Sequence, residues 1–183
     1  MNWKVREAVR ALENGGIIAY PTETVYGLGC DPLNGAAVLR LLALKQRNIR
    51  QGLVLIAAEF SRLEPLLLPQ SPLVTKRVTA HRAVPTTWVL PCRPEVPEWL
   101  RGMHNSLAVR ITRHPLAAEL CRQWGSALVS TSANLHGRPP ATSPLAVHRA
   151  FDGRLDCILH GERGSGTPSE IRDAISARIL RSS

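Results

Sequence analysis

The stretch "LALKQRNIRQGLVLI", residues 42–56, joins two apolar runs of different periodicity through a turn rich in cations. The first run ends a pattern of helical spacing over residues 34–46, and the second, residues 53–57, has the short and continuous apolar character of a buried strand. A helix that leads directly into a buried strand is typical of α/β proteins. The stretch therefore predicts a strand within a sheet that helices cover.

Three cations lie between that helix and that strand: Lys45, Arg47 and Arg50. Cations in the last turn of a helix offset its macrodipole, and this structural interpretation is sufficient for many such clusters. The alternative is that the helix ends at a pocket where these side chains hold an anion. The stretch by itself leaves both interpretations open.

The same alternation of helices and strands continues along the chain. We predict further helices over residues 2–14, from residue 61, over residues 73–81 and 115–124, and from residue 144. We predict further strands over residues 17–20, 87–90, 107–111, 127–130, 155–159, 170–173 and 177–180, with residues 21–29 as a loop. The pattern indicates a single α/β domain over residues 1–183, built on a largely open sheet of mixed strand direction.

Composition limits the classes of protein and partner. The chain has 183 residues, is 44% hydrophobic and carries a formal net charge of +9, so one core is expected and anionic partners should be attracted. Its four cysteines form no C-x-x-C pair, which makes a structural zinc site improbable. No apolar run approaches the ~20 residues of a membrane span. We expect a cytoplasmic protein with reduced thiols and no membrane partner.

Polar residues concentrate in three segments beside predicted strands: "PTETVYGLG" at 21–29, "VSTSANLHG" at 129–137 and "GERGSGTPSE" at 161–170. Ligands of open α/β sheets bind at strand ends, so hydroxyl and amide groups there are candidates for holding phosphate or sugar oxygens. Each segment also has a purely structural explanation as a turn, a helix cap or a flexible connection.

Arg110 differs from these loop residues because it follows Ala108 and Val109 within a predicted strand, "SLAVRIT". A buried guanidinium without a partner is costly, so Arg110 must meet a carboxylate. That carboxylate belongs either to the protein or to a ligand, and arginine suits both because it binds carboxylates in a bidentate manner.

Five motifs occur along the chain in this order: "IAYPTETVYGLG", "LKQR", "SLAVRIT.HP", "VSTSAN..G" and "PSEIRD". The chain resembles the YrdC/TsaC-type threonylcarbamoyl-AMP synthases in their short, single-domain bacterial form, and the resemblance extends from about residue 17 to residue 181. It implies a twisted, mixed α/β sheet with a large basic concave face. It also implies condensation of L-threonine, bicarbonate or CO2, and ATP into threonylcarbamoyl-adenylate and pyrophosphate, with Mg²⁺ accompanying ATP.

The resemblance also implies partners and roles for single residues. A transfer complex would pass the threonylcarbamoyl group to an adenosine beside the tRNA anticodon, and direct contact with tRNA or other RNA is an open expectation. Lys45 and Arg47 match the family's K-x-R pair, and Ser132 and Asn134 its S-x-N pair; these four would bind the triphosphate and stabilise charge. The positions that match the threonine site are Thr24, Arg110, Ser130 and Ser169. The remaining positions, on the nucleotide side, are Gln51, Ser106 and Arg181.

Two further expectations concern the site. No protein ligands for a resident metal are expected, and Arg50 is not expected to share the role of Arg47.

The alternative function is a basic RNA-binding protein that acts in ribosome or rRNA maturation, which would bind RNA in a strongly salt-dependent and ATP-independent way. An aromatic content of 4% offers few platforms for stacking of single-stranded bases, which favours the enzyme.

Overall fold

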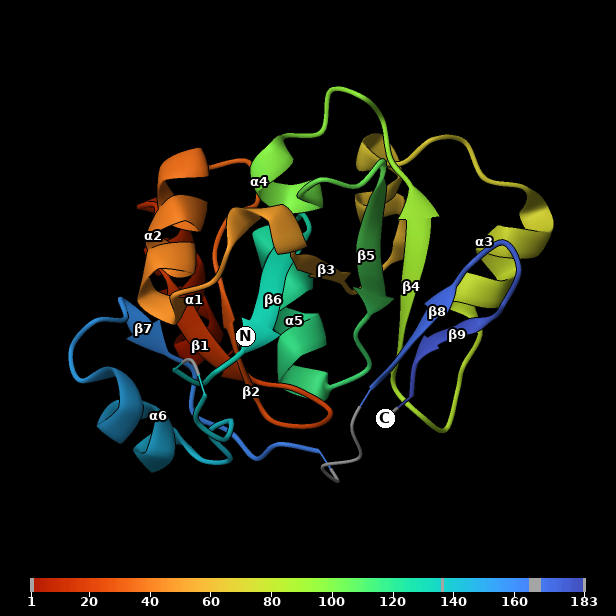
Figure 1. Cartoon of the computed structure of the whole chain (residues 1–183). Coiled ribbons are helices and arrows are strands. Elements are labelled where there is room, and N and C mark those ends of the chain that lie inside the picture. The colour runs from red at the N-terminus through yellow and green to blue at the C-terminus, as the bar shows by residue number, and fades with distance from the viewer. Residues whose placement is uncertain (1, 136, 165–168, 183) are drawn as a thin grey trace.

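A computed structural model of the chain describes residues 2–135, 137–164 and 169–182 (Figure 1). Its helices are α1 (Trp3–Glu13), α2 (Gly35–Lys45), α3 (Pro72–Thr79), α4 (Glu98–Arg101), α5 (Pro115–Trp124) and α6 (Pro144–Phe151), with short 3₁₀ turns η1 (Ile49–Gln51), η2 (Phe60–Arg62) and η3 (Glu64–Leu66). Its strands are β1 (Ile18–Pro21), β2 (Tyr26–Gly29), β3 (Val54–Ala57), β4 (Thr86–Pro91), β5 (Ser106–Ile111), β6 (Leu128–Ser132), β7 (Cys157–Ile158), β8 (Glu170–Asp173) and β9 (Ile179–Arg181).

The described strands form one mixed sheet in the order β7-β1-β2-β6-β3-β5-β4-β8-β9. Strand β6 joins the two halves, because it pairs antiparallel with β2 on one side and with β3 on the other. The pair β3 and β5 is parallel, as is the pair β4 and β8. The predicted α/β class and mixed sheet are confirmed.

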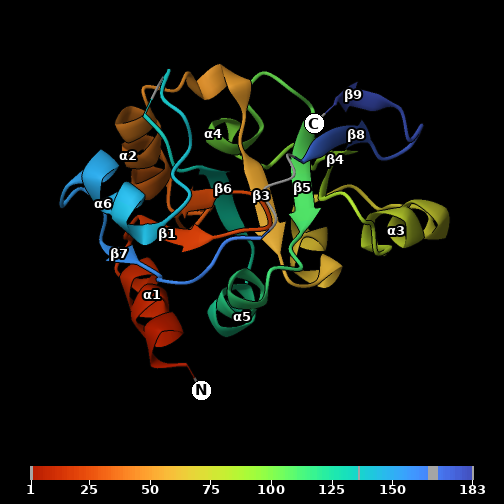
Figure 2. The same cartoon turned by 90° about the horizontal axis from the view of Figure 1, so that it is seen from below.

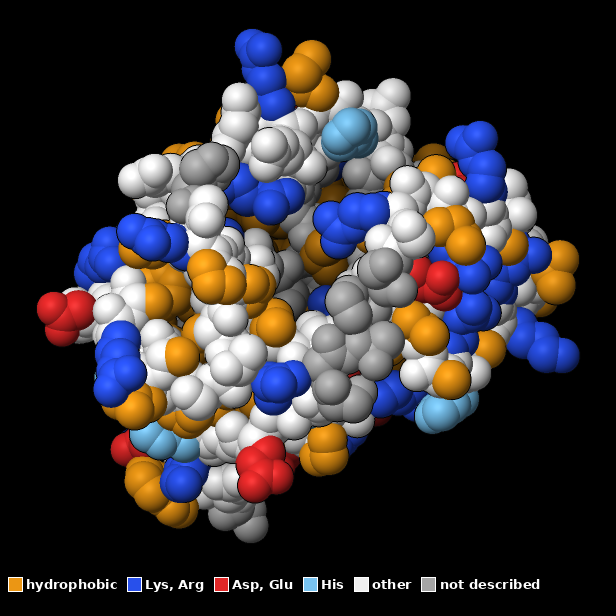
Figure 3. Space-filling model, turned by 60° about the horizontal axis from the view of Figure 1, so that its bottom comes forward, with side chains coloured by type: hydrophobic (Ala, Val, Ile, Leu, Met, Phe, Trp, Pro, Cys, Tyr) orange, Lys and Arg blue, Asp and Glu red, His pale blue; other side chains and the backbone are white. Residues whose placement is uncertain are grey.

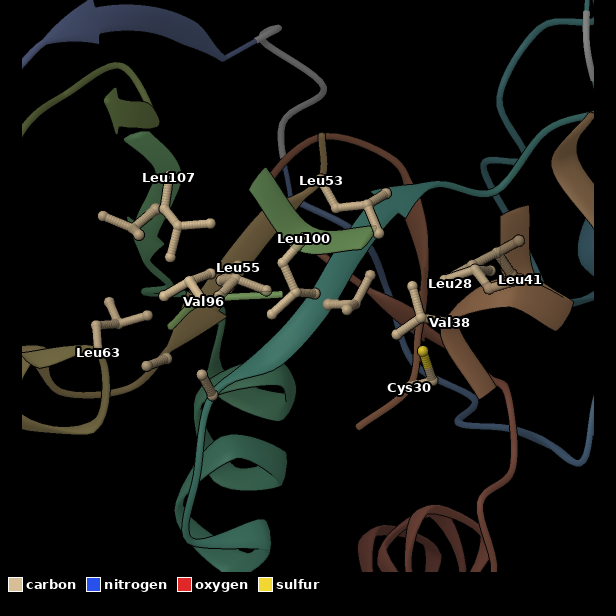
Figure 4. Close-up of a cluster of buried hydrophobic side chains, with 14 of the residues drawn as sticks. Leu28, Cys30, Val38, Leu41, Leu53, Leu55, Leu63, Val96, Leu100 and Leu107 are labelled. Atoms are coloured by element: carbon tan, nitrogen blue, oxygen red, sulfur yellow. The ribbon is translucent and has the colours of Figure 1, made fainter. Parts of the chain in front are cut away.

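Helices cover both faces of this sheet (Figure 2). On one face, Val5, Leu12 and Leu120 from α1 and α5 pack against Tyr20 and Ile56 of the strands. On the opposite face, α2 and α4 pack against the sheet within the larger apolar cluster, part of which is drawn in Figure 4. Because side chains alternate between the two faces of each strand, those on one face pack into one hydrophobic core and those on the other face into a second.

Helix starts agree with the sequence because their capping residues act locally. Side chains cap five helices by accepting a hydrogen bond from a backbone amide in the first turn; these are Asn2, Asn34, Ser71, His114 and Ser143. Proline occupies the first turn of α3, α5 and α6, where its missing N–H costs nothing. None of the described helices is long and apolar enough to cross a membrane.

Two local predictions were wrong. Residues 21–29 are not a loop: Pro21 ends β1, and Tyr26–Gly29 forms β2, which pairs with β1 as a hairpin. Two glycines in four residues hid this strand, whose stability comes from pairing on both edges. The short helix α4 was also missed, although Pro97 and Gly102 bound it.

Candidate functional site

One face of the sheet carries the polar residues of the site. Register pairs Val54 of β3 with Ser130 of β6 and with Ala108 of β5, so these three side chains share a face. Two residues further along their strands, Arg110 and Ser132 lie on the same face. Helices α1 and α5 cover part of this face, and another part, with residues of β3, β4, β5, β6 and β8, lines a cavity.

A large cavity of about 520 Å³ opens on this face. It brings together segments that are far apart in the sequence, namely the β1–β2 turn, the end of α2, strands β5 and β6, and the β8–β9 hairpin. The predicted residues that line it are Thr24, Arg47, Arg110, Ser130, Ser132, Ser169 and Arg181. Figure 3 shows Lys and Arg side chains around a hollow in the surface.

A side cavity of about 290 Å³ adjoins the large one and shares Arg47, Leu53, Val54 and Ile171 with it. The two remaining nucleotide-side predictions, Gln51 and Ser106, line this side cavity. It also contains Leu100, Val89 and Leu180, which give it an apolar character suited to a flat, weakly polar group. The predicted threonine residues therefore line the large cavity, two of the three nucleotide-side residues line the side cavity, the third, Arg181, lines the large one, and the two cavities meet at Arg47.

Lys45 lines neither of these cavities, and its side chain supports the loop that follows β6. Its Nζ donates to the backbone oxygens of Ser132 (2.5 Å) and Asn134 (2.9 Å) and to Asn134 Oδ1 (3.0 Å). The three protons of the ammonium thus meet three acceptors, and the residue is only 7% exposed. Burial, together with nearby Arg47, lowers the pKa of Lys45 to about 8.

Asn134 also lies behind the cavity wall. Its Oδ1 accepts from Ser132 Oγ (2.6 Å), and its Nδ2 donates to the carbonyl oxygens of Leu135 and Arg138. The helix end and the loop after β6 therefore converge, as their predicted common role requires. Only Arg47 and Ser132 of the four motif residues line the large cavity.

Arg47 is the cation that both cavities share. Its Nη2 donates to Gly52 O (2.9 Å), which fixes the side chain, while its buried Nε has no hydrogen-bond partner among the described residues. Gln46 ends α2 with a left-handed backbone conformation (φ 50°). Because this residue lies between Lys45 and Arg47, their side chains reach different parts of the molecule. Burial and the charge of Arg181 lower the pKa of Arg47, so an anion in the cavity would relieve an electrostatic cost.

Of the two kinds of carboxylate partner that the sequence left open for Arg110, the structure shows the one from the protein, and this contact is incomplete. Glu23 Oε2 lies 3.9 Å from Arg110 Nη1, which makes an ion pair but is too long for a hydrogen bond. Arg110 Nε and Nη1 have no hydrogen-bond partner among the described residues. The guanidinium therefore retains capacity for a second carboxylate in the large cavity.

Several lining residues were not predicted from the sequence. Thr22, Thr87 and Pro140 line the large cavity, and Arg101 and His104 line the side cavity. Thr87 lies on the cavity face because the register of the sheet pairs it with Ile171. The others depend on tertiary packing. Arg50 is exposed and lines neither cavity, as expected.

The described residues that line the two cavities include no Asp or Glu. Within the described parts of the chain there is also no cluster of three or more His, Cys, Asp or Glu side chains that could hold a metal ion. The site therefore offers cations, hydroxyls and backbone groups to an anionic ligand, and does not fit a resident divalent metal.

The fold and the site define a class of protein: an α/β domain with a cavity on one face of its sheet that is lined by arginine and hydroxyl side chains. A family model described as Sua5_yciO_yrdC, "Telomere recombination", matches residues 10–183. The chain belongs to this family, and the resemblance seen in its motifs is confirmed.

Relatives of similar length carry one name. A protein named threonylcarbamoyl-AMP synthase from Nitrosococcus oceani is 54% identical, over 98% of this chain and 98% of the relative. One of the same name from Methylococcus capsulatus is 51% identical, over 99% of this chain and 100% of the relative.

Solved structures agree with the fold. P. abyssi Sua5 complexed with L-threonine has a TM-score of 0.81 and 32% identity, covering 92% of this chain and 51% of that one. The chain thus spans about half the length of that Sua5 protein. E. coli YciO, with a TM-score of 0.80 and 24% identity, supports the fold alone.

Proposed function

We propose that this protein is an L-threonylcarbamoyladenylate synthase, a nucleotidyltransferase that uses L-threonine, bicarbonate or CO2, and ATP. Full-length relatives with this name support the proposal. The observation that carries it is the pair of adjoining cavities with Arg47 at their junction. One compartment suits a small amino acid and the other a nucleoside, so that phosphates would lie between them.

In this reaction the amine nitrogen of threonine bonds to the carbon of CO2 and loses a proton, which gives a carbamate. A carbamate oxygen then attacks the α-phosphorus of ATP, and the bond to the pyrophosphate oxygen breaks. When bicarbonate is the source, one water is also released. Negative charge increases on the departing pyrophosphate, and fixed donors aimed at that charge lower the barrier.

The chain's own residues divide this work. Arg110 would bind the threonine carboxylate, with Thr24, Ser130 and Ser169 around the rest of the amino acid. Arg47 and Ser132 would contact the phosphates, and Gln51, Ser106 and Arg181 the nucleotide side. Lys45 and Asn134 would act from behind by fixing the loop that carries Ser132. This arrangement is electrostatic catalysis without a covalent enzyme intermediate.

Mg²⁺ would enter with ATP as part of the substrate. The described cavity residues offer it no carboxylate, so phosphate oxygens and water would be its ligands. The product is a reactive mixed anhydride. We propose that it passes to a transfer complex that delivers the threonylcarbamoyl group to an adenosine beside the tRNA anticodon.

The test uses purified protein with ATP, threonine, bicarbonate and Mg²⁺, and detects threonylcarbamoyl-adenylate by mass spectrometry. Pyrophosphate release should require all three substrates, and leaving out either threonine or bicarbonate should abolish it. Absence of the adenylate under complete conditions would refute the proposal. An RNA-binding protein without this activity would instead retain RNA in a salt-dependent manner, independent of ATP.

A further inference from the structure

Glu23 lies at the tip of the β1–β2 hairpin, and the proposed reaction gives it no role. Its neighbours Thr22 and Thr24 line the large cavity, whereas Glu23 lines a neighbouring cavity of about 350 Å³. Arg110 lines both of these cavities. Glu23 thus meets Arg110 at the neighbouring cavity and does not line the proposed threonine site.

One carboxylate oxygen of Glu23 is firmly anchored. Oε1 accepts hydrogen bonds from Thr112 Oγ1 (2.7 Å), Arg113 N (2.8 Å) and His114 N (3.1 Å). Two of these donors are backbone groups in the connection between β5 and α5. These hydrogen bonds therefore hold the Glu23 carboxylate in a fixed position relative to the backbone between β5 and α5.

The other oxygen is directed at Arg110. Oε2 lies 3.9 Å from Nη1, and the side chains of Arg110 and Glu23 are only 11% and 15% exposed. Solvent screens a pair at this depth weakly, so the attraction restrains the guanidinium even without a hydrogen bond. Since Nε and Nη1 are buried without a partner in the described structure, no other carboxylate lies there to hold them.

The same residue fixes Thr24. The turn that carries both residues is closed by Thr22, whose Oγ1 donates to Val25 O (2.7 Å) and whose N donates to the same oxygen (3.2 Å). Because the Glu23 side chain is bonded to residues 112–114, the turn cannot shift relative to the end of β5 without breaking these bonds. Glu23 thereby couples the two segments that bear Thr24 and Arg110.

We propose that Glu23 is a positioning residue that orients Arg110, and with it Thr24, for binding of the substrate carboxylate. The inference rests on the proposed function, because that function supplies the carboxylate. Glu23 itself does not touch the substrate. Its charge, beside Nη1, restrains the guanidinium, so that Arg110 lines the large cavity in one orientation.

The test compares Glu23→Gln with the wild type by steady-state kinetics. Glutamine keeps the size and an oxygen acceptor for Thr112 and the two backbone amides, but removes the charge that faces Arg110. We expect the KM for threonine to rise about tenfold, with the KM for ATP within twofold of the wild type. Glu13→Gln, the same change on the exposed surface of α1, should alter neither constant.

A double-mutant cycle shows whether Glu23 acts through Arg110. Threonine affinity is measured by calorimetry for Glu23→Gln, Arg110→Lys and the double variant. Once Arg110 is replaced, the Glu23 change should add less than twofold, because the two residues form one unit. Fully additive losses, or an equal rise in both KM values, would overturn the proposal.

The outcomes remain distinct from those of the proposed function. If the wild type forms the adenylate and Glu23→Gln has an unchanged KM for threonine, the positioning role is refuted and the function stands. Should Glu23→Gln fail to fold, Glu23→Asp retains the charge but retracts it by one methylene. It should raise the KM for threonine about threefold without changing that for ATP, and an unchanged value would refute the role.

Discussion

Lys45 and Arg47 show how two cations separated by one residue come to serve different purposes. The ammonium group of Lys45 donates its three hydrogen bonds to the loop after β6, whereas Arg47 lines both cavities. The sequence shows that both are present and that the family motif is complete. It could not show which one points inward, because that depends on the left-handed cap at Gln46 and on the distant Ser132–Asn134 loop.

Arg47→Ala should lower kcat for adenylate formation by about 10²-fold, because it removes a fixed donor beside the departing pyrophosphate. Arg50→Ala is the matched control, since Arg50 is a nearby arginine whose exposed side chain lines neither cavity. It should retain activity within twofold, and the thermal midpoints of both variants should stay close to that of the wild type. Equal losses in the two variants would mean that charge alone matters, and not the placement of Arg47.

Lys45 should give the reaction a descending limb at alkaline pH. Its pKa is lowered to about 8, so above that pH the amine has two protons for three acceptors and has lost its charge. At saturating threonine and bicarbonate, the kcat/KM for ATP, which reports ionisation of the enzyme form that binds ATP, should fall as pH rises through about 8. In Lys45→Arg this limb should move far upward, since guanidinium does not titrate there, even if the activity is lower.

At the scale of elements, the sequence predicted those structures that local chemistry decides. Asn34 and His114 accept from the first turns of their helices, and both helices were predicted to begin at or next to these residues. Strand β2 was missed because "YGLG" has no strong local preference and is held by β1 and β6. For the site, the motifs identified lining residues such as Arg110 and Ser169, whereas Thr87 and Pro140 required the register and packing of the sheet.

The β8–β9 hairpin contributes Ile171 and Arg181 to the large cavity and Leu180 to the side cavity, and α3 holds its turn. Arg77 Nη1 donates to Ala174 O (2.5 Å) and Ile175 O (2.6 Å). Arg77→Ala should destabilise the protein by about 1–3 kcal/mol, the usual cost of losing charged hydrogen bonds. Hydrogen exchange should quicken most over residues 170–181, and the exposed neighbour Lys76→Ala should leave it unchanged. An equal increase in the exchange rate across the whole chain would contradict a local role of Arg77 in holding the β8–β9 turn.

At the scale of the whole molecule, the site is formed by segments from both halves of the sheet. Ligands that bind there should stabilise the native state. Threonine alone or ATP alone, at 100 times its Kd, should add about 2.7 kcal/mol to the free energy of unfolding. For a domain of this length the thermal midpoint should rise by roughly 5–10 °C.

In Arg47→Ala the shift caused by ATP should disappear while that caused by threonine persists, and scanning fluorimetry measures both. Loss of both shifts in this variant would show that Arg47 supports the fold of the cavity and not the binding of phosphates. Arg50→Ala should retain the two shifts.

Strand β6 has a further consequence, for the order in which the chain folds. It pairs with β2, about a hundred residues earlier in the sequence, and with β3, so neither half of the sheet can join the other before Leu128–Ser132 is in place. Closing such long loops loses chain entropy before any contact repays it, which slows folding. Newly made chains should therefore pass through a stage in which the early hairpin and the later strands exist as unjoined pieces with open edges, the stage at which chaperones would be of most use.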